Sequence, residues 1–98
     1  RELAAARRFR ARVVAATLAE NAAELASEGI VTGARNPPVD VESADGRMTA
    51  ELRKGSDGTF EIRGDGTSSG LTAQAAWVRV FGSVAGNRVR IDYTIHSQ

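Results

Sequence analysis

Residues 11–29 read ARVVAATLAENAAELASEG, and this stretch decides the fold class. Alanine dominates it, proline is absent, and its one glycine is Gly29. Such a composition favours an α-helix, and the same character extends back to Arg1. The sequence therefore predicts a helix over residues 1–28. Gly29 is the expected stop, because glycine readily adopts the left-handed conformation that ends many helices.

The remainder of the chain has the composition of a sheet. Residues 31–98 hold nine of the ten glycines, both prolines and most of the valine and isoleucine, the last two in alternating runs. This pattern indicates short strands separated by turns. Ninety-eight residues suffice for one hydrophobic core. We therefore expect a single α+β domain over 1–98, with a long N-terminal helix packed on a small antiparallel sheet of about four strands within 39–96.

The last two predicted strands, 76–84 and 88–96, flank a Gly86-Asn87 turn. That turn sets a register in which the following pairs share one face: Val84 with Val89, Gly82 with Ile91, Val80 with Tyr93, and Val78 with Ile95. Trp77 and Phe81 fall on the opposite face and form a candidate contact surface. Residues 64–70 are predicted to be a flexible loop. The predicted buried set is Val14, Leu18, Leu25, Leu52, Phe60, Ile62, Val78, Val80, Val89, Ile91, Tyr93 and Ile95.

Charge and composition argue against site chemistry. Thirteen Lys and Arg against twelve Asp and Glu leave +1, which gives no support to a nucleic-acid partner. The absence of cysteine excludes thiol catalysis and thiolate metal sites, and a single histidine, His96, excludes a multi-histidine site. No nucleophile or acid–base pair stands beside a partner. We expect no enzyme activity and no catalytic, cofactor-binding or metal-binding residues.

Charge along the predicted helix is reversed with respect to its dipole. Five arginines (1, 7, 8, 10 and 12) occupy the first half, and three glutamates (20, 24 and 28) occupy the second. No capping residue precedes the first turn. Both features predict that the helix begins upstream of Arg1. Its ~40 Å length also exceeds the ~32 Å diameter of a compact domain of this size, so the first turns should overhang the sheet.

Residues 18–25 read LAENAAEL, which resembles a Leu-Ala-Glu-Asn-x-x-Glu-Leu stretch in minor pseudopilins and their type IV pilus relatives. The ending, WVRVF at 77–81 followed by VRIDYTI at 89–95, is similar to the same group. The order of helix and sheet also resembles the soluble part of a type IV pilin or a type II secretion pseudopilin. The family's apolar N-terminal half-helix and the cysteine pair of many type IV pilins do not occur in these residues.

The resemblance implies a structural subunit, a minor pilin or pseudopilin, whose missing apolar half-helix anchors it in the inner membrane. The remaining domain would be periplasmic or extracellular. Its implied partners are other pilins and the inner-membrane assembly machinery, within a cell-surface or periplasmic filament. The candidate filament or partner contacts are Arg7, Phe9, Val13, Trp77 and Phe81.

Two alternatives remain open at this point, and the chain also carries one short motif. A tight-adherence pilus assembly protein has a similar layout. A cystatin-like binding domain would have a pocket between helix and sheet, lined by Trp77 and Tyr93. Arg63-Gly64-Asp65 spells the tripeptide that integrins recognise, at the edge of the predicted loop, although chance matches to it are common.

Overall fold

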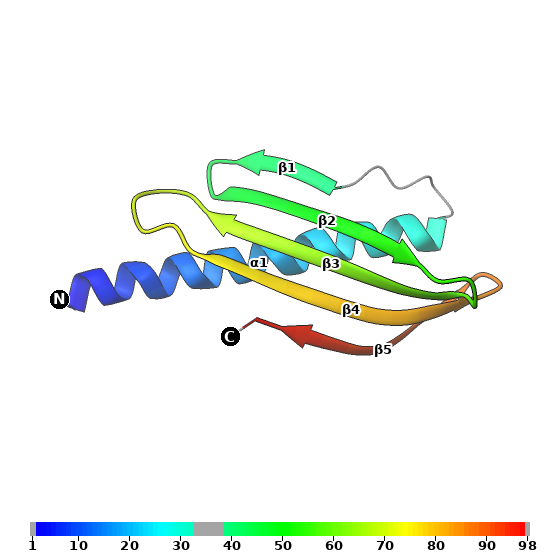
Figure 1. Ribbon diagram of the computed structural model, residues 1–98. Coiled ribbons are helices and arrows are strands. Elements are labelled where there is room, and N and C mark those ends of the chain that lie inside the picture. Colours follow the sequence, from blue (N-terminus) through cyan, green and yellow to red (C-terminus); the bar gives the residue numbers. More distant parts are fainter. Residues whose placement is uncertain (1, 33–38, 98) are drawn as a thin grey trace.

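The computed structural model describes residues 2–32 and 39–97. One helix, α1 (Glu2–Thr32), lies across one face of a five-stranded antiparallel sheet (Figure 1). The strands are adjacent in chain order: β1 (Val39–Ser43), β2 (Gly46–Lys54), β3 (Thr59–Ser68), β4 (Ala75–Ala85) and β5 (Arg88–His96). The predicted α+β class, with a helix packed on an antiparallel sheet, is confirmed, and the sheet has five strands rather than about four.

The helix does not end where the sequence predicts. It continues through Gly29 to Thr32, so the predicted boundary at residue 28 is wrong. Ile30 packs against the core, and this contact stabilises another turn of helix beyond Gly29. A tertiary contact of this kind readily outweighs the ~1 kcal/mol helix penalty of one glycine.

The contact between α1 and the sheet consists of alanine on glycine. The buried face of the helix carries Ala15, Ala19, Ala22, Ala23 and Ala26. Opposite them, a Cβ atom at Gly64 would collide with the carbonyl oxygen of Ala19, and one at Gly66 would collide with that of Ala15. The helix backbone therefore touches the backbone of β3. These glycines belong to a regular strand that reaches Ser68, so the predicted loop over 64–70 is wrong.

This close approach changes the composition of the core. Of the predicted buried set, Phe60, Ile62 and Val78 are buried, while Val14, Leu18, Leu52, Val80 and Val89 are only half-buried. Leu25, Ile91, Tyr93 and Ile95 are exposed, contrary to the prediction. For Leu25 the reason is geometric: the alanine stripe faces the sheet, so the larger side chains of the helix lie along its flank.

The β4–β5 register is correct near the turn and wrong beyond it. Val84 pairs with Val89 and Gly82 with Ile91, as predicted. A bulge between Phe81 and Gly82 then shifts the pairing, so that Phe81 faces Tyr93 and Val78 faces His96. The bulge leaves one residue of β5 unpaired. Every β5 side chain beyond it therefore lies on the opposite face of the sheet from the face that the predicted register gives it. Tyr93 and Ile95 therefore lie on the face away from the helix.

The molecule is elongated, measuring 53 × 23 × 16 Å along its principal axes. The N-terminal part of α1 extends beyond the end of the sheet, so the predicted overhang is present (Figure 1). Every residue from Leu3 to Arg10 is exposed, and the first buried helical side chain is Ala15.

Candidate interaction surfaces

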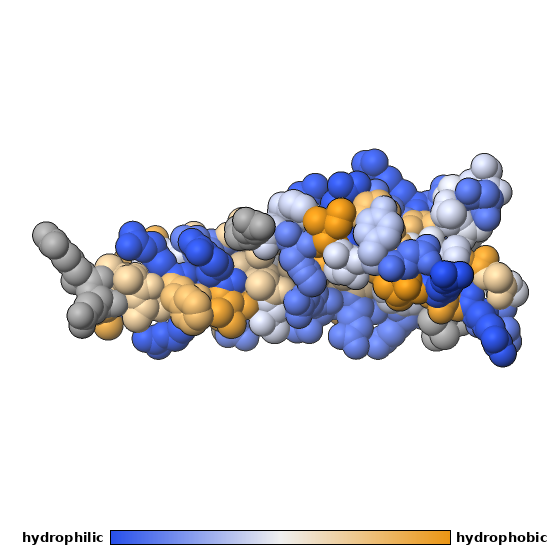
Figure 2. Space-filling model, turned by 90° about the horizontal axis from the view of Figure 1, so that it is seen from below, coloured by the Kyte–Doolittle hydropathy of each residue, from blue (hydrophilic) through white to orange (hydrophobic). Residues whose placement is uncertain are grey.

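The overhang surface, defined here as residues 3–14 of α1, carries exposed apolar side chains. Leu3, Phe9 and Val13 expose 60%, 66% and 48% of their area. Figure 2 shows apolar atoms along this protruding part of the helix, with hydrophilic atoms beside them. Exposed apolar groups of this size mark contact surfaces when they cluster. Phe9 and Val13, which the sequence singled out, thus lie together on one accessible surface.

Arg7 lies on the same overhang, together with three further arginines at positions 8, 10 and 12, and all four are exposed. Arg7 and Arg10 line a shallow hollow where α1 passes the β1–β2 turn, opposite Asp45 and Ser69. Within the described residues, none of these four arginines forms an ion pair. Their charges are therefore available to a partner.

The second half of α1 presents the opposite charge. Glu20 and Glu24 are exposed and lie one turn apart on α1. The Nε2 atom of His96 in β5 lies 4.0 Å from a carboxylate oxygen of Glu20. One helix thus carries a basic overhang followed by an acidic segment above the sheet.

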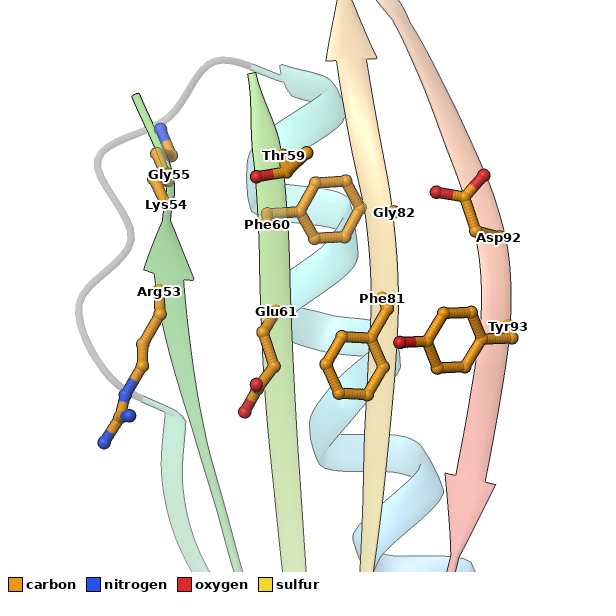
Figure 3. Close-up of a pocket in the computed structure, with 10 residues that line it drawn as sticks. All are labelled: Arg53, Lys54, Gly55, Thr59, Phe60, Glu61, Phe81, Gly82, Asp92 and Tyr93. Atoms are coloured by element: carbon orange, nitrogen blue, oxygen red, sulfur yellow. The ribbon is translucent and has the colours of Figure 1, made fainter. Parts of the chain in front are cut away.

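The outer face of the sheet holds an aromatic and arginine ladder. Phe81 of β4 stacks on Tyr93 of β5 with ring centroids 4.6 Å apart, and both rings are visible in Figure 3. The guanidinium of Arg79 lies 5.0 Å from the centre of the Phe81 ring. One residue pair further along, the guanidinium of Arg63 lies 5.5 Å from the centre of the Trp77 ring. Both separations suit cation–π attraction.

Ion pairs hold this ladder in place. Arg79 donates a hydrogen bond of 2.8 Å to Glu61, which lowers the pKa of the Glu61 carboxyl and raises the pKa of the arginine. Arg63 pairs with Asp65 at 3.1 Å, and the hydrogen bond from Arg63 to that carboxylate raises the arginine's pKa. The charges around Trp77 and Phe81 are therefore neutralised internally, unlike those of the overhang.

Sequence reasoning missed Tyr93 and Ile95 as outer-face residues. Tyr93 exposes 55% and Ile95 41% of its area, and Tyr93 extends the contact surface predicted around Phe81. An open hollow of about 440 Å³ lies beside these rings, between Arg53, Phe81 and Tyr93 (Figure 3). No sequence signal marked Tyr93 and Ile95 as outer-face residues, because the strict alternation expected along a strand does not reveal an inserted residue.

The structure places the residues of the cystatin-like alternative and of the integrin-type tripeptide. Trp77 and Tyr93 lie on the outer face, so they do not line a pocket between helix and sheet, where the cystatin-like alternative put them. The Arg63-Gly64-Asp65 tripeptide lies in the middle of β3, with Gly64 buried against α1 and its two charged neighbours paired. It is not an exposed loop of the kind that integrin ligands present.

Among the residues that the structure describes, no group of three or more His, Cys, Asp or Glu side chains is arranged to hold a metal ion. The described helix contains no segment that is both long and apolar enough to cross a membrane. Comparisons with protein-family models, with curated proteins and with solved structures found no match to this chain.

Proposed function

We propose that this chain is the soluble part of a structural subunit of an extracytoplasmic filament, a minor pilin or pseudopilin. The observation that carries the proposal is the overhang: a helix extends past its own sheet and exposes Leu3, Phe9 and Val13 there. Apolar surface of a helix that is exposed to water has an unfavourable free energy, and this cost is removed only when a partner covers the surface. Helix-to-helix packing between subunits is the function that this surface supports best.

The helical motif that carries the resemblance is consistent with such a role. Within LAENAAEL at 18–25, Ala19, Ala22 and Ala23 are buried against the sheet, while Glu20 and Glu24 are exposed. The small residues thus bring the sheet close to the helix, and the acidic residues stay at its solvent-accessible surface. A thin subunit with an accessible helix can pack side by side with its neighbours along a filament.

The proposal requires an apolar helical segment ahead of Arg1. That segment would anchor the subunit in the inner membrane and leave the described domain in the periplasm or outside the cell. The partners would be other pilins or pseudopilins and the inner-membrane assembly machinery. No enzymatic step belongs to this role. A tight-adherence pilus assembly protein would also need a membrane anchor. That alternative is favoured if filaments form but do not contain this chain.

Deletion of the gene in its native host tests the proposal. We expect loss of surface filaments, of secretion or of DNA uptake. A copy that includes the apolar upstream segment should restore the phenotype, and residues 1–98 expressed alone in the cytoplasm should not. Full complementation by residues 1–98 alone would contradict the proposal, as would a deletion strain with normal filaments, secretion and DNA uptake.

A further inference from the structure

The four arginines of the overhang form a collar around α1. Arg7, Arg8, Arg10 and Arg12 fall within six consecutive residues, which span about 8 Å along a helix axis. At ~100° per residue, the four positions leave one gap of about 160° around the helix. Phe9 and Val13 lie in that gap. We call the four residues the arginine collar.

Among the described residues, none of the four collar arginines has an ion-pair partner, whereas four of the six arginines of the sheet do. Arg47, Arg63, Arg79 and Arg90 each pair with an aspartate or glutamate at 2.8–3.1 Å. The collar arginines form no ion pair with any described carboxylate, although Asp45 shares the hollow with Arg7 and Arg10. Since the whole chain carries only +1, the rest of the molecule is net negative. Positive charge is thus concentrated at one end of an elongated molecule.

We propose that the arginine collar binds the phosphate groups of anionic phospholipids at the membrane surface. The headgroup layer on each side of a bilayer is roughly 5–8 Å deep, which matches the depth of the collar. Guanidinium groups bind phosphate oxygens through paired hydrogen bonds. This inference rests on the proposed function, because an upright helix leaving the membrane would carry all sides of the collar through the headgroup layer.

The distribution of side chains favours lipid over nucleic acid. A nucleic-acid site needs its basic residues gathered on one face, whereas the four arginines spread over about 200° of the helix circumference and Phe9 and Val13 fill the rest. Phe9 and Val13 between the arginines suit the boundary between headgroups and acyl chains, where apolar and basic side chains occur together. The collar would thereby set the height at which α1 leaves the membrane before the subunit is taken into a filament.

Vesicle co-sedimentation of the 98-residue chain tests the proposal. The probes are vesicles of phosphatidylglycerol and phosphatidylcholine at 1:1, and vesicles of phosphatidylcholine alone, at low and at physiological salt. The collar variant is Arg7→Gln/Arg8→Gln/Arg12→Gln. The matched control is Arg53→Gln/Lys54→Gln/Arg88→Gln, which removes the same charge from three residues outside the helix that have no described ion pair. Glutamine is a good helix former, and circular dichroism verifies the fold of both variants.

We expect binding to the anionic vesicles only, weakening with salt. Each basic residue near an anionic surface is worth about five-fold in affinity, so the collar variant should bind at least ten-fold more weakly while the control binds like the wild type. Equal binding of the two variants to the anionic vesicles would overturn the proposal that the collar binds phospholipids. So would absence of binding at low salt, or binding to a DNA duplex in preference to the vesicles. Loss of filaments on gene deletion is a separate readout. If the chain is needed for filaments but does not bind anionic vesicles, the lipid-binding role of the collar is refuted and the proposed function is not.

Discussion

Gly64 and Gly66 allow α1 to lie directly on the backbone of β3. An added methyl group at Gly64 would meet the carbonyl oxygen of Ala19 and the side chain of Ala23, which are parts of a rigid helix. We predict that Gly64→Ala lowers the free energy of unfolding by about 1–3 kcal/mol, the usual cost of overpacking. Urea denaturation measures it.

Gly55→Ala is the matched control for this substitution. Its new methyl group would meet the side-chain oxygens of Thr59 and Asp57, which hydrogen-bond to each other but belong to exposed side chains that can shift toward solvent. We expect a cost of about 1 kcal/mol or less. If Gly64→Ala were as well tolerated as Gly55→Ala, the backbone contact between α1 and β3 would not exist.

The Glu61–Arg79 ion pair predicts a pH dependence of stability. The hydrogen bond from Arg79 lowers the pKa of Glu61 below its ordinary value of 4.5, so the folded state holds the charged form more tightly than the unfolded state does. The pair therefore stabilises fully above pH 4.5, and its contribution disappears as the pH falls through the lowered pKa.

Comparison with Glu61→Gln measures this contribution. The difference in unfolding free energy between the wild type and this variant should be at most about 1 kcal/mol at pH 7, because the pair is partly exposed. Denaturation at a series of pH values should show the difference shrinking below pH 4.5. A difference that grows on acidification would contradict the pairing.

At the scale of single elements, α1 divides into a free part and a packed part. Residues 3–10 are exposed throughout, whereas five alanines between Ala15 and Ala26 are buried. Backbone hydrogen bonds in an unsupported helix open more often than those held by a core. We predict faster amide hydrogen exchange before Ala11 than after Leu18. Uniform protection along the helix would mean that the overhang is covered.

Strand β5 lies at the edge of the sheet and contributes little to the core. Ile91 points to the helix side but exposes 49% of its area, whereas Ile62 of β3 is fully buried. We predict that Ile62→Ala costs about 2–5 kcal/mol in unfolding free energy, and Ile91→Ala about 1 kcal/mol or less. Similar costs for the two substitutions would mean that β5 covers the core at Ile91 and would contradict its exposed position at the edge of the sheet.

The sequence predicted the helix and the strands well, but it predicted less well which face of each of them is buried. Helix and strands could be predicted because alanine is concentrated before residue 31, and valine, isoleucine and glycine after it. The buried face of α1 could not, since hydrophobicity favours Leu18 and Leu25 over alanine, whereas Gly64 and Gly66 admit only the smallest side chains. The bulge left no mark in the alternation of β5, which is why Tyr93 was assigned to the wrong face.

At the scale of the whole molecule, the overhang was predictable from length alone, since a helix of this length exceeds the diameter of a compact domain. Its charge pattern was also visible in the sequence. What required the structure was the finding that four of the six arginines of the sheet pair with carboxylates, whereas none of the four overhang arginines pairs with a described carboxylate. Pairing depends on cross-strand register, which a single shifted residue changes.

The central claim is that the exposed apolar residues of the overhang hold this subunit in a filament. The most direct test places Phe9→Glu/Val13→Glu in the complete gene in the native host, with Leu71→Glu as control. Leu71 is a large apolar residue that is even more exposed than Phe9 and Val13, but it lies in the β3–β4 connection. We predict that the overhang variant accumulates normally yet restores no filaments or secretion, while the control restores both. Full restoration by the overhang variant would contradict the account.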